Sequence, residues 1–212
     1  IPAGVDATRD NQGFIMNRQK DTSCLNLIDE DNSYVDVGTY SGFTFGDASN
    51  DSAFSVSAWI KVPDLSSLPI IAKAASSNRE WVFVFTSSDE LSLYLYDENI
   101  SKYESMKSDS GFASTDQNTW INVAATYDGT GGSGASGGIK LYRNGVALGL
   151  TEVSTATYVA MEALEANVRI GSWEAGSAYT DGQIDNVLLY NKELSAAEVL
   201  RNYNAGKGSH RN

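Results

Sequence analysis

Carboxylates are the side chains of this chain with the greatest capacity for chemistry. They cluster at Asp29, Glu30 and Asp31 and again at Asp89 and Glu90, both times at strand boundaries where turns are expected. Two carboxyl groups held about 5 Å apart can hydrolyse a glycosidic bond, one as nucleophile and one as acid. Carboxylate oxygens are also the hard ligands that calcium prefers. The plain alternative for both clusters is a solvated acidic surface.

Histidine and cysteine are too scarce for the other common kinds of site. His210 is the only histidine and lies in the C-terminal tail, which excludes a Ser or Cys triad and a His-rich zinc site. Cys24 is the only cysteine, so an intrachain disulfide and a paired-cysteine metal site are excluded as well. The run G-T-G-G-S-G from Gly129 matches a phosphate-binding pattern only formally, because it leads into another strand rather than a helix.

Aromatic side chains are the second resource, with 11 Tyr, 7 Phe and 4 Trp. Sugar rings stack their C–H faces on Trp and Tyr, while nearby polar groups fix the hydroxyls. The candidates for such contacts sit on the second face of a strand or in a loop, and they are Trp81, Tyr94, Tyr96, Trp173 and Tyr179. Structural packing is the alternative for each of these rings, and it is the expected role of Trp59 and Trp120.

Alternation of apolar and polar residues predicts many short strands. The alternating segments are residues 33–37, 54–62, 68–74, 80–86, 91–96, 101–106, 120–127, 139–143 and 168–173, followed by a last strand with Ile184, Val187 and Leu189. Such strands, joined by turns rich in Gly, Asn, Asp and Ser, predict an all-β fold, an antiparallel two-sheet β-sandwich. In the run from Trp81, the side chains of Val82 and Val84 point one way, and those of Trp81, Phe83 and Phe85 the other.

One domain, residues 23–204, is expected between two terminal segments. Residues 1–22 are polar apart from Phe14, Ile15 and Met16, and predict an arm with one edge strand. Two short helices are expected, at residues 158–166 and at residues 195–203, the second with Ser195 as N-cap and Glu198 three residues on. The end of the chain, G-K-G-S-H-R-N, holds no apolar side chain, so residues 205–212 are expected to form a flexible tail.

Composition excludes two classes of partner. The chain has 27 acidic and 15 basic residues, a formal net charge of −12, and no cluster of Lys and Arg that could bind phosphates, which excludes nucleic acid. It also lacks any apolar run of about 18 residues, so no membrane insertion is expected. The first residue is Ile1 rather than Met, and no signal peptide is visible, which fits a fragment or a processed product.

Five motifs point together to one family. They are Y-V-D-V-G from Tyr34, F-S-V-S-A-W-I-K-V from Phe54, T-W-I-N-V-A-A-T-Y-D-G from Thr119, I-K-L-Y-R-N-G from Ile139 and G-Q-I-D-N-V-L-L-Y-N-K-E-L-S-A-A-E from Gly182. Over roughly residues 24–204 the chain resembles the laminin-G-like domains of the concanavalin A-like lectin/glucanase superfamily. The resemblance implies a concanavalin A-like jelly roll with a short C-terminal helix. It is far less specific for activity, because a fold does not fix a function.

The resemblance also bears on catalysis and on metal binding. Catalytic glucanases of this superfamily carry a Glu-x-Asp-x-Glu strand, and because this chain has no such triplet, it is not expected to be an enzyme. Many related domains hold a structural calcium between the early strands and the Asp of the final strand. By position, the resemblance implies that Ca²⁺ is bound by Asp185, with Asp29 and Glu30 from the family's early F-D-G turn. Glu30 replaces the usual Gly of that turn.

The leading functional hypothesis is a non-catalytic recognition module that binds a glycan or another surface ligand, outside the cell or on a virion surface. The alternative is a virion structural or decoration protein, because the chain resembles laminin-G-like domains of phage structural proteins and has no cysteine pair. A degenerate glycoside hydrolase is held in reserve. The expected partners are a glycan or a protein of a cell surface or virion. The protein could also form a homo-oligomer or attach to a larger assembly.

Overall fold

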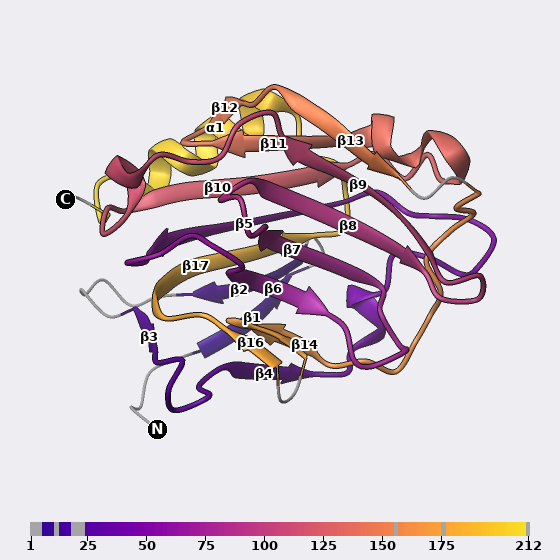
Figure 1. Ribbon diagram of the computed structural model, residues 1–212, viewed down its shortest axis with the longest axis horizontal. Coiled ribbons are helices and arrows are strands. Elements are labelled where there is room, and N and C mark those ends of the chain that lie inside the picture. The colour runs from indigo at the N-terminus through magenta and orange to yellow at the C-terminus, as the bar shows by residue number, and fades with distance from the viewer. Residues whose placement is uncertain (1–5, 11–12, 18–23, 155–156, 175–176, 211–212) are drawn as a thin grey trace.

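Two antiparallel sheets stack face to face in the computed structural model, which describes residues 6–10, 13–17, 24–154, 157–174 and 177–210 (Figure 1). Sheet A has the strand order β1-β2-β17-β5-β10-β11-β12, and β3 pairs with one end of β17. Its strands are β1 (Asp6–Asp10), β2 (Gly13–Asn17), β3 (Leu25–Leu27), β5 (Phe54–Lys61), β10 (Ile121–Tyr127), β11 (Ile139–Arg143), β12 (Val146–Ala147) and β17 (Gly182–Tyr190).

Sheet B has the strand order β13-β9-β8-β7-β6-β14-β4. Its strands are β4 (Val35–Gly38), β6 (Pro69–Lys73), β7 (Trp81–Phe85), β8 (Leu91–Asp97), β9 (Lys102–Ser108), β13 (Leu150–Ser154) and β14 (Val168–Ile170). After β14 the chain bends at Gly171, whose φ of +79° favours glycine. It then forms a separate hairpin of β15 (Ser172–Glu174) and β16 (Ser177–Tyr179).

Helices are few in the described part of the chain. One α-helix, α1 (Ala196–Gly206), follows the last strand, and the 3₁₀ helices are η1 (Ser41–Phe43), η2 (Ser114–Asp116) and η3 (Gly132–Gly138). None of the helices within the described residues is both long and apolar enough to cross a bilayer.

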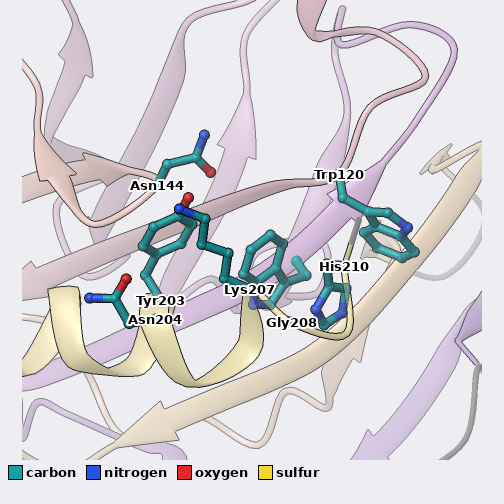
Figure 2. A pocket seen from close by; sticks show the side chains of 8 residues that line it. Trp120, Asn144, Tyr203, Asn204, Lys207, Gly208 and His210 are labelled. Atoms are coloured by element: carbon teal, nitrogen blue, oxygen red, sulfur yellow. The ribbon is translucent and has the colours of Figure 1, made fainter. Parts of the chain in front are cut away.

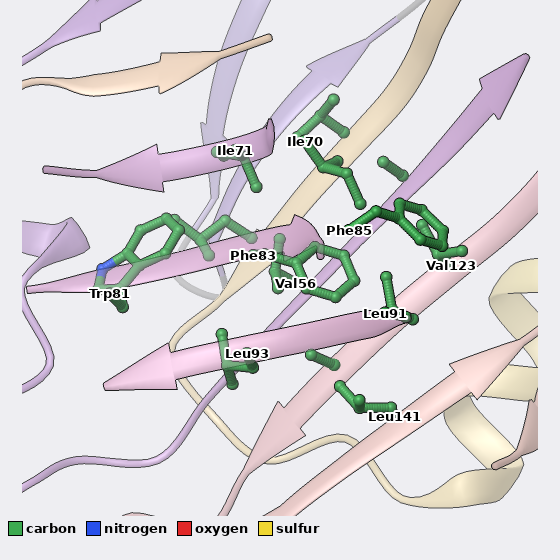
Figure 3. Packing of buried hydrophobic residues seen from close by; sticks show 14 of the residues in the cluster. Val56, Ile70, Ile71, Trp81, Phe83, Phe85, Leu91, Leu93, Val123 and Leu141 are labelled. Atoms are coloured by element: carbon green, nitrogen blue, oxygen red, sulfur yellow. The ribbon is translucent and has the colours of Figure 1, made fainter. Parts of the chain in front are cut away.

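The main core fills the space between the two sheets (Figure 3). Val56 and Val123 reach it from sheet A, and Trp81, Phe83 and Leu93 reach it from sheet B. Alternation along each strand supplies these side chains, because every second residue faces the partner sheet. Each fully buried side chain of this size contributes about 1.5–3 kcal/mol, so this layer is the main source of stability.

The expected all-β sandwich with a short C-terminal helix is confirmed by this architecture. The N-terminal arm, predicted to hold one edge strand, instead contributes the two paired strands β1 and β2, of which β2 pairs with β17. The sequence prediction also missed β13, which pairs with β9 along its whole length.

The prediction of a helix at residues 158–166 is wrong. Residues 157–167 have no regular secondary structure, and we call them the carboxylate-held loop. Their backbone N–H groups donate to carboxylates of distant segments instead of to a helical carbonyl: Val159 to Asp97, Met161 to Asp51 and Leu164 to Glu80, at 2.8–3.0 Å. The local helix propensity is overridden because these tertiary bonds satisfy the same donors.

A fully buried ion pair anchors the end of this loop. Lys73 Nζ lies 2.6 Å from Glu80 Oε1 and also donates to the carbonyls of Leu164 and Ala166. Burial raises the pKa of Glu80, while its hydrogen bond with Lys73 acts in the opposite direction. The carboxylate of Glu80 balances the charge of Lys73, and the lysine N–H groups all have acceptors, as a buried ion pair requires.

Asp51 fixes the other end of the loop. Its Oδ2 accepts hydrogen bonds from the hydroxyls of Tyr127 and Tyr158, both at 2.7 Å, and its Oδ1 accepts from the N–H of Met161 at 2.8 Å. Burial raises the pKa of Asp51, and these three bonds oppose that shift. One carboxylate thus ties β10 to the carboxylate-held loop.

Asp51→Asn is expected to lower the free energy of unfolding by about 2 kcal/mol, or the Tm by roughly 4–8 °C, because the amide nitrogen cannot accept a hydrogen bond. Thermal unfolding followed by circular dichroism measures the change. Asp31→Asn, which removes the same charge from an exposed turn, is the control and is expected to unfold like the unmodified protein. Equal Tm values for the two variants would contradict this role of Asp51.

The start of α1 is a capping box. The N–H of Glu198 donates to Ser195 Oγ at 3.3 Å, the N–H of Ser195 donates back to Glu198 Oε2 at 2.9 Å, and Lys192 Nζ lies 2.7 Å from Glu198 Oε1. The hydrogen bond from Lys192, followed by those from Ser195, lowers the pKa of Glu198 from 4.5 to about 2. This anion holds the first turn of the helix.

Glu198→Gln is expected to be less stable than the unmodified protein at pH 6, and the difference should shrink between pH 6 and pH 3. The pKa of Glu198 is lower in the folded state, so its contribution is complete above about 4.5 and is lost as the pH falls toward about 2. Urea unfolding of both proteins at several pH values measures the difference. A difference that stays constant across this range would contradict the assignment.

Candidate functional site

A group of aromatic rings lies on the outer face of sheet B, the face turned away from sheet A. Val82 and Val84 of β7 point to this face and, with Ala72 and Ala74, form a floor of small side chains. Larger rings surround this floor, two from β8, one from β9 and one from the β15–β16 hairpin. We define the tyrosine face as these four residues: Tyr94, Tyr96, Tyr103 and Trp173.

The rings of the tyrosine face contact one another directly. Tyr94 and Tyr96 lie two residues apart on one strand, with centroids 6.0 Å apart and planes 19° from parallel. Tyr103 stands across from Tyr96 in the strand register, 5.8 Å from it, and Trp173 lies 6.3 Å from Tyr94. Tyr96 is buried by these neighbours, whereas the other three rings are half-buried and keep part of their surface open to solvent.

Charged groups flank the rings. Arg79 places its guanidinium 4.3 Å from the centroid of Tyr96 and forms a two-point ion pair with Glu98. Burial acts to raise the pKa of Glu98, but the hydrogen bonds and charge of Arg79 outweigh it and lower that pKa. Lys107 and Glu90 form a second ion pair of 2.9 Å on a neighbouring part of sheet B.

The phenols of Tyr94 and Tyr96 stay protonated at neutral pH. Burial raises the pKa of Tyr94 and that of Tyr96, so neither hydroxyl ionises near pH 7. Each hydroxyl can therefore both donate and accept a hydrogen bond. The face combines flat apolar rings with neutral hydroxyls and paired charges at its edge.

Three of the five aromatic residues predicted to bind ligand are brought together on this face: Tyr94, Tyr96 and Trp173. The prediction that Trp81 contacts a ligand is wrong, because its ring is 0% exposed within the main core and its Nε1 donates to the carbonyl of Phe43. The alternation in β7 was assigned correctly, but both of its faces are apolar, so the pattern did not identify the inward one.

Tyr179 is not among the rings packed on the tyrosine face, and its ring lies 6.0 Å from that of Tyr34. Sequence reasoning also missed two members of the site, Tyr103 and Arg79. Tyr103 could have been found, because it alternates with the inward Glu104 on a strand that was expected at residues 101–106. Arg79 lies between a turn and the start of β7, and no local pattern marks it.

The outer face of sheet A is covered by α1 and by the segment after it. The expected flexible tail at residues 205–212 is wrong for its described part, because Ala205 and Gly206 still belong to α1 and His210 is only 5% exposed. The His210 ring stacks on Trp59 at 4.2 Å, with planes 6° from parallel. Its Nε2 lies 2.8 Å from Asp185 Oδ2, and its Nδ1 lies 2.8 Å from the carbonyl of Gly206.

A pocket of about 640 Å³ opens beside this segment, and we call it the helix pocket (Figure 2). Its aromatic walls are Trp59, Trp120, Tyr203 and His210, and its polar groups are Asn144, Asn204 and Lys207. Gly206 lets the helix end lie directly on Trp59, since a Cβ atom at this position would come within 2.5 Å of Trp59 Nε1.

The residues implied as calcium ligands are not assembled into one site. Asp185 faces His210 and the N–H of Asn186 on the outer side of sheet A, while Asp29 and Glu30 lie in the exposed turn after β3. Across the described ranges, no group of three or more His, Cys, Asp or Glu side chains could hold a metal ion. These three residues therefore do not fit a shared calcium ion, which needs six or more oxygens around it.

Asp185→Ala is expected to lower the free energy of unfolding by about 2 kcal/mol, because the buried hydrogen bond with His210 is lost. The loss should be equal in calcium chloride and in EDTA, as measured by thermal unfolding. Asp29→Ala, in the exposed turn, is the control and should change stability little in either buffer. A stabilisation by calcium that Asp185→Ala abolishes would restore Asp185 as a metal ligand.

Comparison with known proteins agrees with this architecture. The family model described as the concanavalin A-like lectin/glucanases superfamily matches residues 31–200. No curated protein matches the chain. The binding domain of botulinum neurotoxin serotype G has a TM-score of 0.60 and 16% identity, and the match covers 96% of this chain and 47% of that one.

Two further solved structures show the same fold. Domain 4 of an extracellular arabinanase from Geobacillus stearothermophilus, in complex with arabinotriose, has a TM-score of 0.55 and 15% identity over 94% of this chain and 81% of that one. The binding domain of Paraclostridial Mosquitocidal Protein 1 has a TM-score of 0.57 and 15% identity over 95% and 45% of the two chains.

The chain spans less than half of the toxin binding domains that it matches, from 36% for the mosaic serotype C/D domain to 47% for serotype G. At these identities the likeness concerns the fold alone. The family model, however, matches most of the chain, and the two-sheet sandwich agrees with it. This chain therefore belongs to the concanavalin A-like lectin/glucanase superfamily.

Proposed function

We propose that this protein is a non-catalytic recognition module that binds a glycan on the tyrosine face, outside the cell. The observation that carries this proposal is the set of three half-buried rings, Tyr94, Tyr103 and Trp173, gathered on one side of a rigid sheet. Half-buried aromatic rings on a fixed scaffold offer flat, partly open surfaces to the C–H faces of sugars, at little cost in conformational entropy.

The polar groups of the face suit hydroxyl-rich ligands. The hydroxyls of Tyr94 and Tyr103 belong to the face, and the half-buried Glu174 directly follows Trp173 in the chain. Arg79 is fixed by its ion pair with Glu98, so its remaining donors are held in place. Mixed donors and acceptors around an apolar platform are the usual composition of a ligand site.

The same charges favour binding over hydrolysis. Glycoside hydrolysis requires one carboxyl group with a raised pKa that can donate a proton to the leaving group. Glu98 has the opposite shift, because Arg79 lowers its pKa, and Glu90 is paired with Lys107. Glu98, with its lowered pKa, is therefore a poor proton donor, and Glu90 holds Lys107 in place.

Related folds support the assignment of a glycan. The arabinanase domain with 15% identity was solved in complex with arabinotriose. Cell entry of botulinum neurotoxin type C, a structure of which has 21% identity, depends on interaction with two ganglioside molecules. We extend carbohydrate binding from those proteins to this chain on the strength of the tyrosine face. A setting on a virion surface stays a prediction from the sequence.

Trp173→Ala and Tyr94→Ala are each expected to weaken glycan binding about tenfold, since one lost stacking ring corresponds to roughly 1.4 kcal/mol. A glycan array identifies the ligand, and affinity electrophoresis or calorimetry then measures the dissociation constant. Tyr94→Phe keeps the ring and should bind more tightly than Tyr94→Ala.

Tyr40→Ala is the matched control, because Tyr40 is an exposed aromatic residue outside the tyrosine face. This variant should bind as the unmodified protein does. Thermal unfolding of each variant separates loss of binding from loss of the fold. An array without any bound glycan, or unchanged affinity in folded Trp173→Ala, would refute the proposal, and release of reducing ends from the bound glycan would refute its non-catalytic part.

A further inference from the structure

The helix pocket lies on the opposite side of the sandwich from the tyrosine face. Its walls belong to α1, the segment after α1 and the outer side of sheet A, whereas the tyrosine face belongs to sheet B. Its volume of about 640 Å³ falls within the usual range for small-molecule sites. An inference about this pocket therefore stands independently of glycan binding on sheet B.

The aromatic wall of the helix pocket is held rigidly in place. Tyr203 stacks on Trp59 with centroids 5.5 Å apart and planes 21° from parallel, and His210 stacks on the same indole. Trp120 meets His210 edge-on at 4.8 Å. Because the two polar contacts of His210 fix its ring, a ligand would meet a surface that is already formed.

Two of these rings remain accessible. Trp59 is 4% exposed and His210 is 5% exposed, so they form the floor. Trp120 and Tyr203 are half-buried and lie at different sides of the opening in Figure 2. The accessible faces are thus spaced around a cavity large enough for a sugar ring.

Lys207 gives the pocket its charge. It is exposed, and its Nζ lies 5.5 Å from the centroid of the Tyr203 ring. Among the described residues, no carboxylate forms an ion pair with Lys207, and none lines the pocket. Asp185 lies behind the floor and faces His210. In a chain with a formal net charge of −12, a cation beside aromatic walls without a neighbouring acid favours an anionic ligand.

We infer that the helix pocket is a second binding site, for a sugar that carries a carboxylate. The sugar ring stacks on Trp120 or Tyr203, the carboxylate pairs with Lys207, and the hydroxyls meet the side-chain amides of Asn144 and Asn204 (Figure 2). The carboxylate distinguishes this ligand from a neutral sugar, because only an anion gains from Lys207.

The four tryptophans allow each site to be followed separately. Trp59 and Trp120 line the helix pocket, Trp173 belongs to the tyrosine face, and Trp81 is enclosed in the core. The indole N–H signals of ¹⁵N-labelled protein, assigned by single Trp→Phe substitutions, therefore report on the two surfaces and on the core. Chemical-shift changes during titration give a dissociation constant for each site.

The probes are methyl glucuronide, methyl galacturonide and N-acetylneuraminic acid, with methyl glucoside and methyl galactoside as neutral counterparts of the first two. At least one acidic probe is expected to shift the Trp120 signal while Trp81 stays unchanged, and to bind about tenfold more tightly than its neutral counterpart. If no acidic probe moves Trp120, or if the neutral sugars bind equally well, the inference is overturned.

Lys207→Gln is expected to weaken binding of the acidic probe about tenfold, to the level of its neutral counterpart. Lys140→Gln is the matched control, because it removes the same charge from an exposed ion pair with Glu193 outside the pocket. It should leave binding unchanged. An equal loss in both variants would show an effect of net charge alone and overturn the site.

Trp173→Ala separates this inference from the proposed function. The variant should lose glycan binding on the tyrosine face and still show the shift of Trp120 with the acidic probe. A loss of the Trp120 response in folded Trp173→Ala would contradict two independent sites.

Discussion

The second face of each sheet has to be covered, and this constraint shapes both candidate sites. Packing the sheets together buries one face of each, yet β6 and β7 are buried along their whole length on both faces. On sheet B the cover consists of large rings over a floor that includes Ala72 and Val82. On sheet A it consists of α1, with Val199 packed against Tyr142 and Ala124. Aromatic rings that cover a sheet leave part of their own surface open to solvent, and a ligand can bind at such a place.

The acidity of the chain is partly structural. Several of its carboxylates accept hydrogen bonds from backbone N–H groups: Glu80, Asp97 and Glu162 are buried, and Asp51 is half-buried. Glu162 accepts from the N–H groups of Glu98 and Asn99, so the carboxylate-held loop also positions the turn that carries Glu98. Because Glu98 in turn holds Arg79 over Tyr96, a network of hydrogen bonds reaches from the loop to the edge of the tyrosine face.

Much of the fold could be predicted from the sequence, because strand alternation is a local signal. The segments around β5, β7, β8 and β10 were placed within one or two residues of their observed ends. Residues 158–166 were assigned to a helix, because their composition favours one and the carboxylates that capture their N–H groups come from distant parts of the chain. Local propensity cannot register such long-range partners.

The candidate sites were predictable only in part, for a related reason. Alternation separated the two faces of β7 but could not say which face meets the core, so Trp81 was assigned to the wrong side. The tail was expected to be flexible because it has no apolar residue, yet His210 is enclosed by Trp59, Trp120 and Asp185. Each of these partners lies far away in the sequence, so only the folded chain brings them to His210.

The β15–β16 hairpin has a consequence for how this protein can diversify. It belongs to neither sheet, it leaves β14 at Gly171, and it carries Trp173 onto the tyrosine face. Changes in its length or composition would alter the surface offered to a ligand without repacking the sandwich, because the core residues lie elsewhere. The hairpin is thus the segment through which ligand preference could evolve, or be engineered, at the least risk to folding.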